Sequence, residues 1–249
     1  MKPQASIASI ASATTSLDMR VGRHDWSAST IELGSYGCTV IGQLLEPEEC
    51  ASMATLYSQE KHFRSHIHMA QHGFGKGEYR YFKNPLPHLV GDLRMLLYPR
   101  LAIAANDWND QLGISRRYPE THAEFLRLCH EAGQTRPTPL LLQYGSGDFN
   151  CLHQDIYGDL VFPIQVAILL SQPDHDFTGG EFVLTEQRPR MQSRVEVVPL
   201  KQGDAVAFAV HNRPVRGSRG SYRVNMRHGV SRVRSGKRHT LGIIFHDAR

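Results

Sequence analysis

Three residues of this chain have the types and the spacing that hold a catalytic metal ion. His153 and Asp155 lie two positions apart, and His228 follows far downstream. An iron(II) ion that activates oxygen is bound on one side by two histidines and one carboxylate, and its other positions stay open. Side chains two apart in a strand point to the same side, so His153 and Asp155 can hold one ion together. The third ligand must come from a distant strand, and His228 is our first candidate.

A second group of residues has the chemistry to hold a carboxylate near that metal. Arg238 follows His228 by ten positions and offers a rigid fork of donors that can bind a carboxylate bidentately. Thr240, two positions later, shares its face if the segment is a strand. Tyr144 precedes the metal pair and is a further donor candidate. A metal triad beside a carboxylate anchor is what an enzyme that uses iron(II), 2-oxoglutarate and O2 requires.

The choice of distal ligand leaves alternatives, because the chain has 14 histidines. A His-x-Asp triplet alone is weak evidence in such a chain. Three other histidines in the C-terminal third are alternatives to His228, namely His211, His239 and His246. His228 ranks first because its spacing to Arg238 fits one pair of strands.

The segments around these residues alternate between apolar runs and Gly-rich turns, which is typical of strands joined by short connections. The turns are at 145–148, 179–180 and 201–204, and the apolar runs are at 140–144, 181–184, 205–210 and 240–245. The pattern predicts a β-rich C-terminal half that carries the candidate metal ligands and the candidate carboxylate anchor.

In this order, the residues resemble the iron(II)/2-oxoglutarate dioxygenases, and in particular their prolyl-hydroxylase branch. The resemblance covers residues 137–249 and rests on this series: Tyr144, His153, Asp155, Gly179-Gly180-Glu181, Gly203-Asp204, His228, Arg238 and Thr240. It implies an α+β protein with a mainly β core, a double-stranded β-helix (jelly roll) with supporting N-terminal helices. It also implies Fe(II) as cofactor, with 2-oxoglutarate and O2 as cosubstrates.

Two further segments are similar to a bacterial family of AlkB-like oxygenases that act on methylated nucleic acid. They are Tyr157-Gly158 and residues 185–190. This resemblance implies oxidative demethylation of alkylated nucleic acid, as in DNA repair. The segment 228–232 instead lacks the Asn-x-Thr-x-Arg-like pattern of AlkB enzymes, and the C-terminal pattern of the chain is closer to prolyl hydroxylases. A hydroxylase of a protein or small molecule is therefore the alternative, and a binding protein that uses no iron is a third.

The charge of the chain is concentrated in its C-terminal part. The formal net charge is +4, yet residues 188–249 contain fourteen Lys and Arg against three acidic residues. A basic Gly/Pro loop with Arg213, Arg216 and Arg219 comes shortly before His228. A basic loop at the mouth of an active site is typical of phosphate-backbone binding, so we expect a nucleic-acid partner. The alternative is a solvated loop whose charges pair with acids elsewhere.

The N-terminal half is predicted to be helical support for this core. Pro47 opens one helix, apolar residues continue at helical spacing over 89–101, and Thr121 and Glu124 form a capping box. We divide the chain into a disordered tail at 1–18, helical support with a candidate substrate lid at 19–136, and the β-helix core at 137–249, packed as one domain. The composition of residues 1–18, rich in Ala, Ser and Thr, favours disorder.

The segment 62–88 is the candidate lid because it is rich in His, Gly and aromatic residues. Tyr79 and Tyr81 are candidates to stack on a flipped base. As strand residues, Tyr81 and Phe82 would instead pack against the barrel.

Composition also excludes several classes of protein. No apolar stretch is long enough to span a bilayer, and the N-terminal residues do not form a secretory signal, so we expect no membrane partner and a cytoplasmic location. The four cysteines have no disulfide-like or metal-finger spacing. Cys151, two positions before His153, is expected to face the metal side of its strand. The sequence makes no prediction of the oligomeric state.

Overall fold

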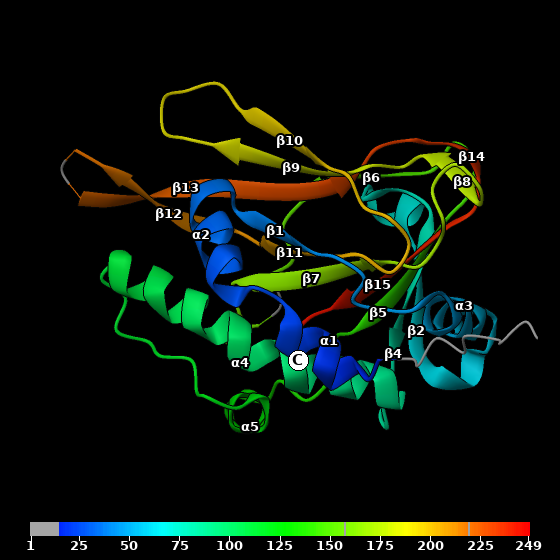
Figure 1. Cartoon of the computed structure of the whole chain (residues 1–249), viewed down its shortest axis with the longest axis horizontal. Helices are drawn as coiled ribbons and strands as arrows, with labels where there is room; N and C mark the ends of the chain where they lie inside the picture. The colour runs from blue at the N-terminus through cyan, green and yellow to red at the C-terminus, as the bar shows by residue number, and fades with distance from the viewer. Residues whose placement is uncertain (1–14, 157, 219) are drawn as a thin grey trace, which may run out of the picture.

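The computed structural model describes residues 15–156, 158–218 and 220–249, so the tail at 1–14 lies outside the described residues. Two antiparallel sheets face each other, and a long helix covers the outer face of the larger one (Figure 1). The larger sheet has the strand order β1-β11-β7-β15-β5-β4-β2 and the smaller one β10-β9-β13-β6-β3, with β12 paired to β13. This arrangement agrees with the predicted mainly β core.

The larger sheet consists of β1 (Cys38–Ile41), β2 (Phe63–His68), β4 (Glu78–Phe82), β5 (Leu140–Tyr144), β7 (Ile164–Leu169), β11 (Ala205–Ala209) and β15 (Arg238–Ile243). The smaller sheet consists of β3 (Gly75–Lys76), β6 (Phe149–His153), β9 (Phe182–Gln187), β10 (Arg194–Val198), β12 (Asn212–Gly217) and β13 (Gly220–Val230). A separate pair is formed by β8 (Phe177–Gly179) and β14 (Val233–Gly236).

The three helices that the sequence predicted from capping residues and from apolar residues at helical spacing are confirmed. They are α3 (Pro47–Thr55), α4 (His88–Gln111) and α5 (His122–Glu131). The capping box of α5 forms, because Thr121 accepts from the Glu124 backbone and Glu124 reaches back to the Thr121 backbone. Three short 3-10 turns lie between α3 and β3, at Leu56–Ser58, Glu60–His62 and Met69–His72.

The prediction of a disordered tail to residue 18 is wrong at its end. Helix α1 spans Leu17–Arg23, with Ser16 as its N-cap, and α2 spans Trp26–Tyr36, with Asp25 as its N-cap. Each cap accepts hydrogen bonds from backbone N–H groups of the first turn, which is the usual role of Ser and Asp before a helix. Leu17 and Asp18 are therefore helical.

The prediction of helical support with a candidate lid before residue 137 is also incomplete, because this part of the chain contributes strands to both sheets. Strand β1 pairs with β11, and β2 and β4 extend the larger sheet beyond β5. The core crosses the predicted boundary as well, because Tyr98 of α4 packs its ring against those of Phe162 and Phe245, at centroid separations of 5.0 and 6.0 Å. Residues on both sides of position 137 thus share one hydrophobic core.

Candidate active site

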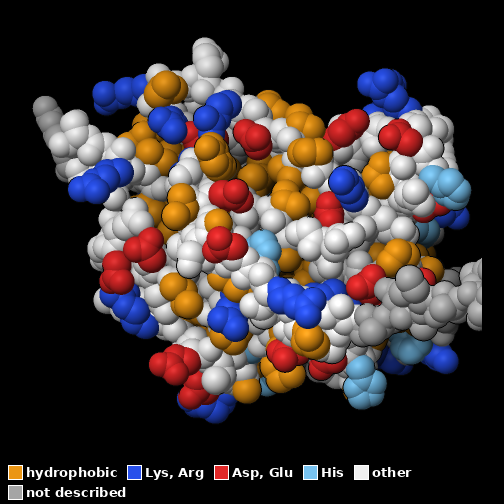
Figure 2. Space-filling view, viewed as in Figure 1, with side chains coloured by type: hydrophobic (Ala, Val, Ile, Leu, Met, Phe, Trp, Pro, Cys, Tyr) orange, Lys and Arg blue, Asp and Glu red, His pale blue; other side chains and the backbone are white. Residues whose placement is uncertain are grey.

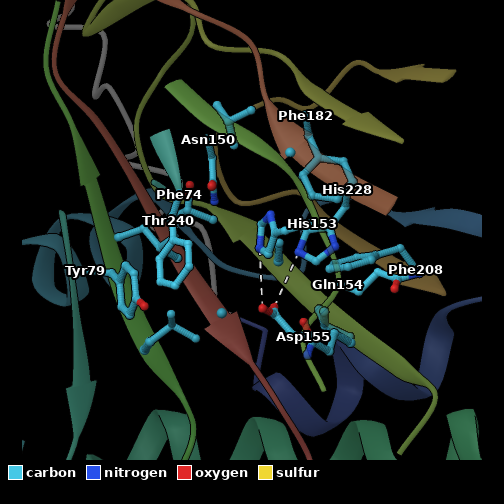
Figure 3. Close-up of a pocket in the computed structure, with 18 of the residues that line it drawn as sticks. Phe74, Tyr79, Asn150, His153, Gln154, Asp155, Phe182, Phe208, His228 and Thr240 are labelled. Carbon is cyan, nitrogen blue, oxygen red and sulfur yellow. Dashed lines mark ion pairs between the residues drawn. The ribbon is translucent and has the colours of Figure 1, made fainter. Parts of the chain in front are cut away.

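The three predicted metal ligands come together between the two sheets. His153, the last residue of β6, and His228, on β13, are direct cross-strand partners, so their rings lie side by side at a centroid distance of 4.2 Å. Asp155 faces both of them, with Oδ1 3.4 Å from His153 Nε2 and Oδ2 3.4 Å from His228 Nε2 (Figure 3). One ligand atom from each residue lies within 4.8 Å of the other two. This set of two imidazoles and one carboxylate fits a facial iron(II) site.

Asp155 reaches this position in a different way from the one that the sequence suggested. Strand β6 ends at His153, so strand alternation does not orient the Asp155 side chain. Gln154 instead fixes the segment, because its Nε2 donates to the Met226 carbonyl oxygen at 2.7 Å and also to the side-chain oxygen of Asn225. The chain after β6 is thereby tied to β13, and Asp155 turns inward between the histidines.

Burial of the three groups makes the cluster electrostatically coupled. Burial opposes ionisation of Asp155, but hydrogen bonds from His153 and His228 hold the pKa of its carboxyl well below the usual range. Burial, together with the nearby His153, lowers the pKa of His228. Burial also disfavours a charge on His153, yet the Asp155 carboxylate raises its pKa overall. An ionised carboxylate beside a neutral imidazole is the protonation state that a divalent metal ion needs.

The second ring nitrogen of His153 is oriented away from the site. Its Nδ1 lies 2.8 Å from the Cys151 carbonyl oxygen and donates a hydrogen bond to it. In this tautomer Nε2 carries no proton, so its lone pair can bind a metal ion. His228 is positioned by packing, because its ring lies 4.6 Å from that of Phe208 and 6.1 Å from that of Phe182. Both imidazoles therefore present Nε2 to the same point.

The predicted carboxylate anchor lies in the same pocket. Arg238 is only 2% exposed, and its Nη1 donates to Thr240 Oγ1 at 2.5 Å. In the described part of the chain, no carboxylate pairs with Arg238, and its Nε has no hydrogen-bond partner. Burial lowers the pKa of this guanidinium to about 10. A buried cation without an anion is costly, so the site has the donors and the charge to fit a carboxylate such as that of 2-oxoglutarate.

Tyr144 completes this end of the pocket. It is the cross-strand partner of Arg238, its ring lies 5.6 Å from the guanidinium carbon, and its hydroxyl lies 3.4 Å from the amide nitrogen of Asn150. Burial raises the pKa of Tyr144, so its hydroxyl stays protonated. Gly77, at a φ of +120°, makes this packing possible, because a Cβ there would come within 2.8 Å of the Tyr144 ring.

The metal cluster and the anchor line one cavity of about 220 Å³. Its deep wall is formed by β5, β7 and β15, and its rim includes three aromatic side chains, Phe74, Tyr79 and Tyr81. In Figure 3, Phe74 and Tyr79 lie across the cavity from His228. The segment 62–88 thus contributes β2, β3 and β4 to the sheets, and it also supplies these three aromatic side chains of the rim. Phe82 packs in the core against Phe63, at a centroid distance of 4.9 Å.

The prediction for the basic loop is wrong for Arg213. This side chain is 1% exposed and forms a buried ion pair with Glu186 of β9, so it cannot meet a phosphate. Arg216 is exposed near the end of the β12–β13 hairpin, and Arg219 lies outside the described residues. The hairpin end is also far from the pocket, because His228 lies eight positions after Gly220 along β13, or about 26 Å.

Other expectations are corrected by side-chain direction. Cys151 is exposed and does not line the cavity, because β6 is irregular at this point. His153 pairs with His228 and Asn150 with Val230, so the register of β6 against β13 shifts between them, and regular alternation does not carry from Cys151 to His153. His239 points to the opposite face of β15 from Arg238 and contacts Gln143. His246 is fully buried and accepts a hydrogen bond from the Phe162 backbone. Neither of these histidines belongs to the cluster of His153, Asp155 and His228.

Several pocket residues carried no signal that the sequence analysis could use. Asn150, Gln154, Phe182 and Phe208 line the cavity, but each is a common residue in an ordinary strand or connection. Phe182 follows the predicted turn at 179–180, so the alternation of its strand was the one available indication. Among the helices of the described residues, none is long and apolar enough to cross a bilayer.

Known proteins share this chain's sequence and fold. Residues 77–248 match a protein family described as an oxygenase catalysing oxidative methylation of damaged DNA. The uncharacterized protein Rv2227 of Mycobacterium tuberculosis (strain ATCC 25618 / H37Rv) is 50% identical over 167 residues, which are 67% of this chain and 72% of that protein.

Solved structures share the fold at low sequence identity. A prolyl hydroxylase from Trichoplax adhaerens, in complex with a hypoxia inducible factor peptide fragment, has a TM-score of 0.56 at 15% identity, covering 93% of this chain and 92% of that one. An oxidoreductase of the 2OG-Fe(II) oxygenase family from Burkholderia pseudomallei has a TM-score of 0.52 at 16% identity, covering 91% and 93%. The predicted double-stranded β-helix is confirmed. The chain belongs to the oxygenase family that its residues 77–248 match, and it shares its fold with the solved 2OG-Fe(II) oxygenase.

Proposed function

We propose that this oxygenase removes methyl groups from alkylated nucleic acid by oxidising them, with Fe(II), 2-oxoglutarate and O2. One observation carries the proposal, namely the single pocket that combines a metal-binding face, a buried arginine and an aromatic rim. The family description, which names damaged DNA, supports the same class of substrate.

In this proposal, each polar group of the pocket has a separate task. His153, Asp155 and His228 bind the iron, which when present couples the activation of O2 to the decarboxylation of 2-oxoglutarate. Arg238 and Thr240 bind the far carboxylate of the cosubstrate, and Tyr144 gives a further hydrogen bond. The apolar walls around His228 exclude water, which strengthens these charged interactions.

The overall reaction balances without a further oxidant. One oxygen atom of O2 enters the C–H bond of the substrate methyl group, and the other enters succinate as carbon dioxide leaves 2-oxoglutarate. An N-methyl group becomes N–CH2–OH. Its C–N bond then breaks as the hydroxyl proton moves to nitrogen, which gives the bare amine nitrogen and formaldehyde. On a carbon that is not bound to nitrogen, the hydroxyl group simply remains.

The aromatic side chains of the rim suit a flat substrate, because they can stack on it. Phe74 is 46% exposed, and the rings of Tyr79 and Tyr81 meet edge to face at a centroid distance of 5.4 Å. Aromatic side chains at a pocket entrance stack on a base that has left its helix, each contributing about 1–3 kcal/mol. We infer that the methylated base enters between this rim and Asp155.

Basic side chains on the two long hairpins support contact with a phosphate backbone. Lys and Arg side chains gather at the end of the molecule formed by β9–β10 and β12–β13 (Figure 2). The exposed ones in the described residues include Arg190, Arg194, Arg216, Arg223 and Arg227. Phosphate contacts of this kind are independent of sequence and weaken steeply with salt.

The second candidate is hydroxylation of a protein, and the segment 228–232 favours it. This segment lacks the Asn-x-Thr-x-Arg-like pattern of AlkB enzymes, and the C-terminal pattern of the chain resembles that of prolyl hydroxylases more closely. The iron chemistry would be the same for both substrates, so only the pocket entrance distinguishes them.

Formaldehyde release separates the two candidates. The protein is given Fe(II) and 2-oxoglutarate with an N-methylated single-stranded oligonucleotide, the same oligonucleotide without methyl groups, or a proline-containing peptide. We expect formaldehyde from the methylated strand alone, and none from a His153→Ala variant. Succinate that rises with the peptide, without formaldehyde from the methylated strand, would overturn the proposed substrate in favour of hydroxylation.

A further inference from the structure

We propose that His66, His68 and Glu78 form a second cation site, which takes a divalent transition metal ion of the Zn²⁺ type. The site lies on the larger sheet, on the opposite face from the active pocket.

The three side chains converge on one point. One ligand atom from each lies within 4.8 Å of the other two. His66 Nε2 is hydrogen-bonded to Glu78 Oε2, and His68 Nδ1 lies 3.8 Å from the same oxygen. The two imidazole rings are 4.3 Å apart between centroids. One ring nitrogen of each histidine thus lies close to the same carboxylate oxygen. The three atoms are near enough to one another to bind a single metal ion.

Strand geometry produces this convergence. His66 and His68 are two apart on β2, so they share a face, and Glu78 on β4 is the cross-strand partner of His68. Directly opposed residues in an antiparallel pair bring their Cβ atoms to about 5 Å. The backbone of this ladder therefore holds all three side chains together before any ion binds.

The carboxylate is oriented by neighbours that leave one oxygen for the ion. Gln143 Nε2 donates to Glu78 Oε1 at 3.0 Å, and Gln143 Oε1 lies 3.1 Å from His239 Nε2. Glu78 Oε2 then points to the histidines. A hydrogen-bonded carboxylate behind the ligands is a usual feature of metal sites in proteins.

The donor set and its surroundings suit a zinc-like ion. Two imidazoles and one carboxylate match zinc sites with three protein ligands and one open position. The side chains of His66 and His68 are 32% and 54% exposed, so an ion can reach them from solvent. Arg80, on the same face, lies over the Tyr57 ring at 5.0 Å and, within the described residues, forms no ion pair with Glu78.

An ion at this site would affect the pocket rim, because the site lies on the strand that carries two of the rim side chains. Tyr79 and Tyr81 alternate with Glu78 along β4 and so project from the other face, into the pocket rim. An ion bound by β2 and β4 would clamp these two strands. It would thereby restrict the strand that carries the two tyrosines.

Zinc stoichiometry tests the proposal without measuring activity. Zn²⁺ alone is added to the metal-free full chain, and bound metal is counted after dialysis. The donor set of the pocket cluster, two imidazoles and one carboxylate, also suits Zn²⁺. We therefore expect two ions per chain in the wild type, one in His66→Ala/His68→Ala and one in His228→Ala. His88→Ala/His175→Ala, which removes two exposed histidines elsewhere, should retain two.

A second variant guards against a folding artefact, because Glu78→Gln keeps the shape of the side chain and removes its charge. It should weaken the second binding event by about tenfold or more and leave the circular dichroism spectrum unchanged. Equal zinc binding in the wild type and in His66→Ala/His68→Ala would overturn the proposal. So would a complete loss of zinc from His228→Ala.

Discussion

Arg238 and Thr240 form a hydrogen-bonded pair of side chains on one face of β15, with Nη1 and Oγ1 2.5 Å apart, in a buried end of the cavity. The metal-ligand face opens onto the same cavity. Within the described residues, no carboxylate forms an ion pair with the Arg238 guanidinium. The folded protein therefore buries a positive charge at a cost in free energy. Such a cation is typical of a binding site rather than of a core.

The first prediction separates binding from stability at Arg238. In Arg238→Met, the affinity for 2-oxoglutarate should fall by about 10²- to 10⁴-fold, because a charged hydrogen bond contributes about 1.5–3 kcal/mol and two are lost. The melting temperature of the free protein should stay equal or rise, since a buried unpaired charge has been removed. Calorimetric titration and thermal unfolding check both effects. A lower melting temperature with unchanged affinity would contradict the assigned role.

The second prediction contrasts two arginines of one hairpin. Arg213 donates to the carbonyl oxygens of Gly34 and Ser35, at 2.6 and 2.9 Å, in addition to its pair with Glu186. Arg213→Met should therefore destabilise the fold by up to about 3–5 kcal/mol. Arg216→Glu should leave the free energy of unfolding unchanged. It should instead reduce the salt dependence of oligonucleotide binding by about one unit of slope. Denaturant unfolding measures the free energy of unfolding of each variant, and oligonucleotide binding at several salt concentrations measures the slope. Equal losses of stability in Arg213→Met and Arg216→Glu would contradict this prediction.

The third prediction concerns the aromatic rim. Phe74→Ala should raise the KM for a methylated oligonucleotide by about tenfold, since one stacking contact contributes about 1–3 kcal/mol. The rate of succinate formation without substrate should not change, because Phe74 is not in the metal or carboxylate site. Met95→Ala, which alters a side chain 58% exposed on α4, is the matched control. An unchanged KM in steady-state kinetics would remove Phe74 from the substrate site.

The fourth prediction follows from buried histidines in the core. Burial lowers the pKa of both His122 and His246 to about 4, from 6.5 in the unfolded chain. Between these values the unfolded state binds more protons, so the free energy of unfolding should fall as the pH falls from about 6.5 to about 4. The loss is up to about 3 kcal/mol for each histidine. Denaturant unfolding across this range checks it.

His246→Gln is the matched variant for this pH dependence. Gln has an oxygen that can accept the Phe162 backbone N–H, which His246 Nδ1 accepts at 3.2 Å. The free energy of unfolding of His246→Gln should fall less steeply with decreasing pH than that of the wild type. Identical slopes for the two proteins would show that His246 does not contribute.

The sequence was informative where chemistry and spacing coincide. His153, Asp155, His228, Arg238 and Thr240 were predicted together, and the structure brings them into one cavity. Their types are restricted by the ion and the carboxylate that they suit, so the pattern is visible in the chain itself. The caps of α3 and α5 were visible for the same reason, since a cap is a local hydrogen bond.

The rest depended on contacts between distant segments. Arg213 has the same type and the same loop context as Arg216, and only its pairing with Glu186 on another strand buries it. The strands at 38–41 and 78–82 are short and are added at or near the edges of a sheet whose other members come much later in the chain. Asp155 is oriented by Gln154 across to β13, and alternation along its own strand could not show this.

The most direct test of the site is the formation of succinate from 2-oxoglutarate in the presence of Fe(II) and O2. We compare the wild type with His228→Ala and Asp155→Ala, using His66→Ala/His68→Ala as the control with an intact pocket. Succinate formation should fall by at least about 10²-fold in the two pocket variants and persist in the control. Wild-type rates in His228→Ala and Asp155→Ala would contradict the assignment of His153, Asp155 and His228 as the iron site.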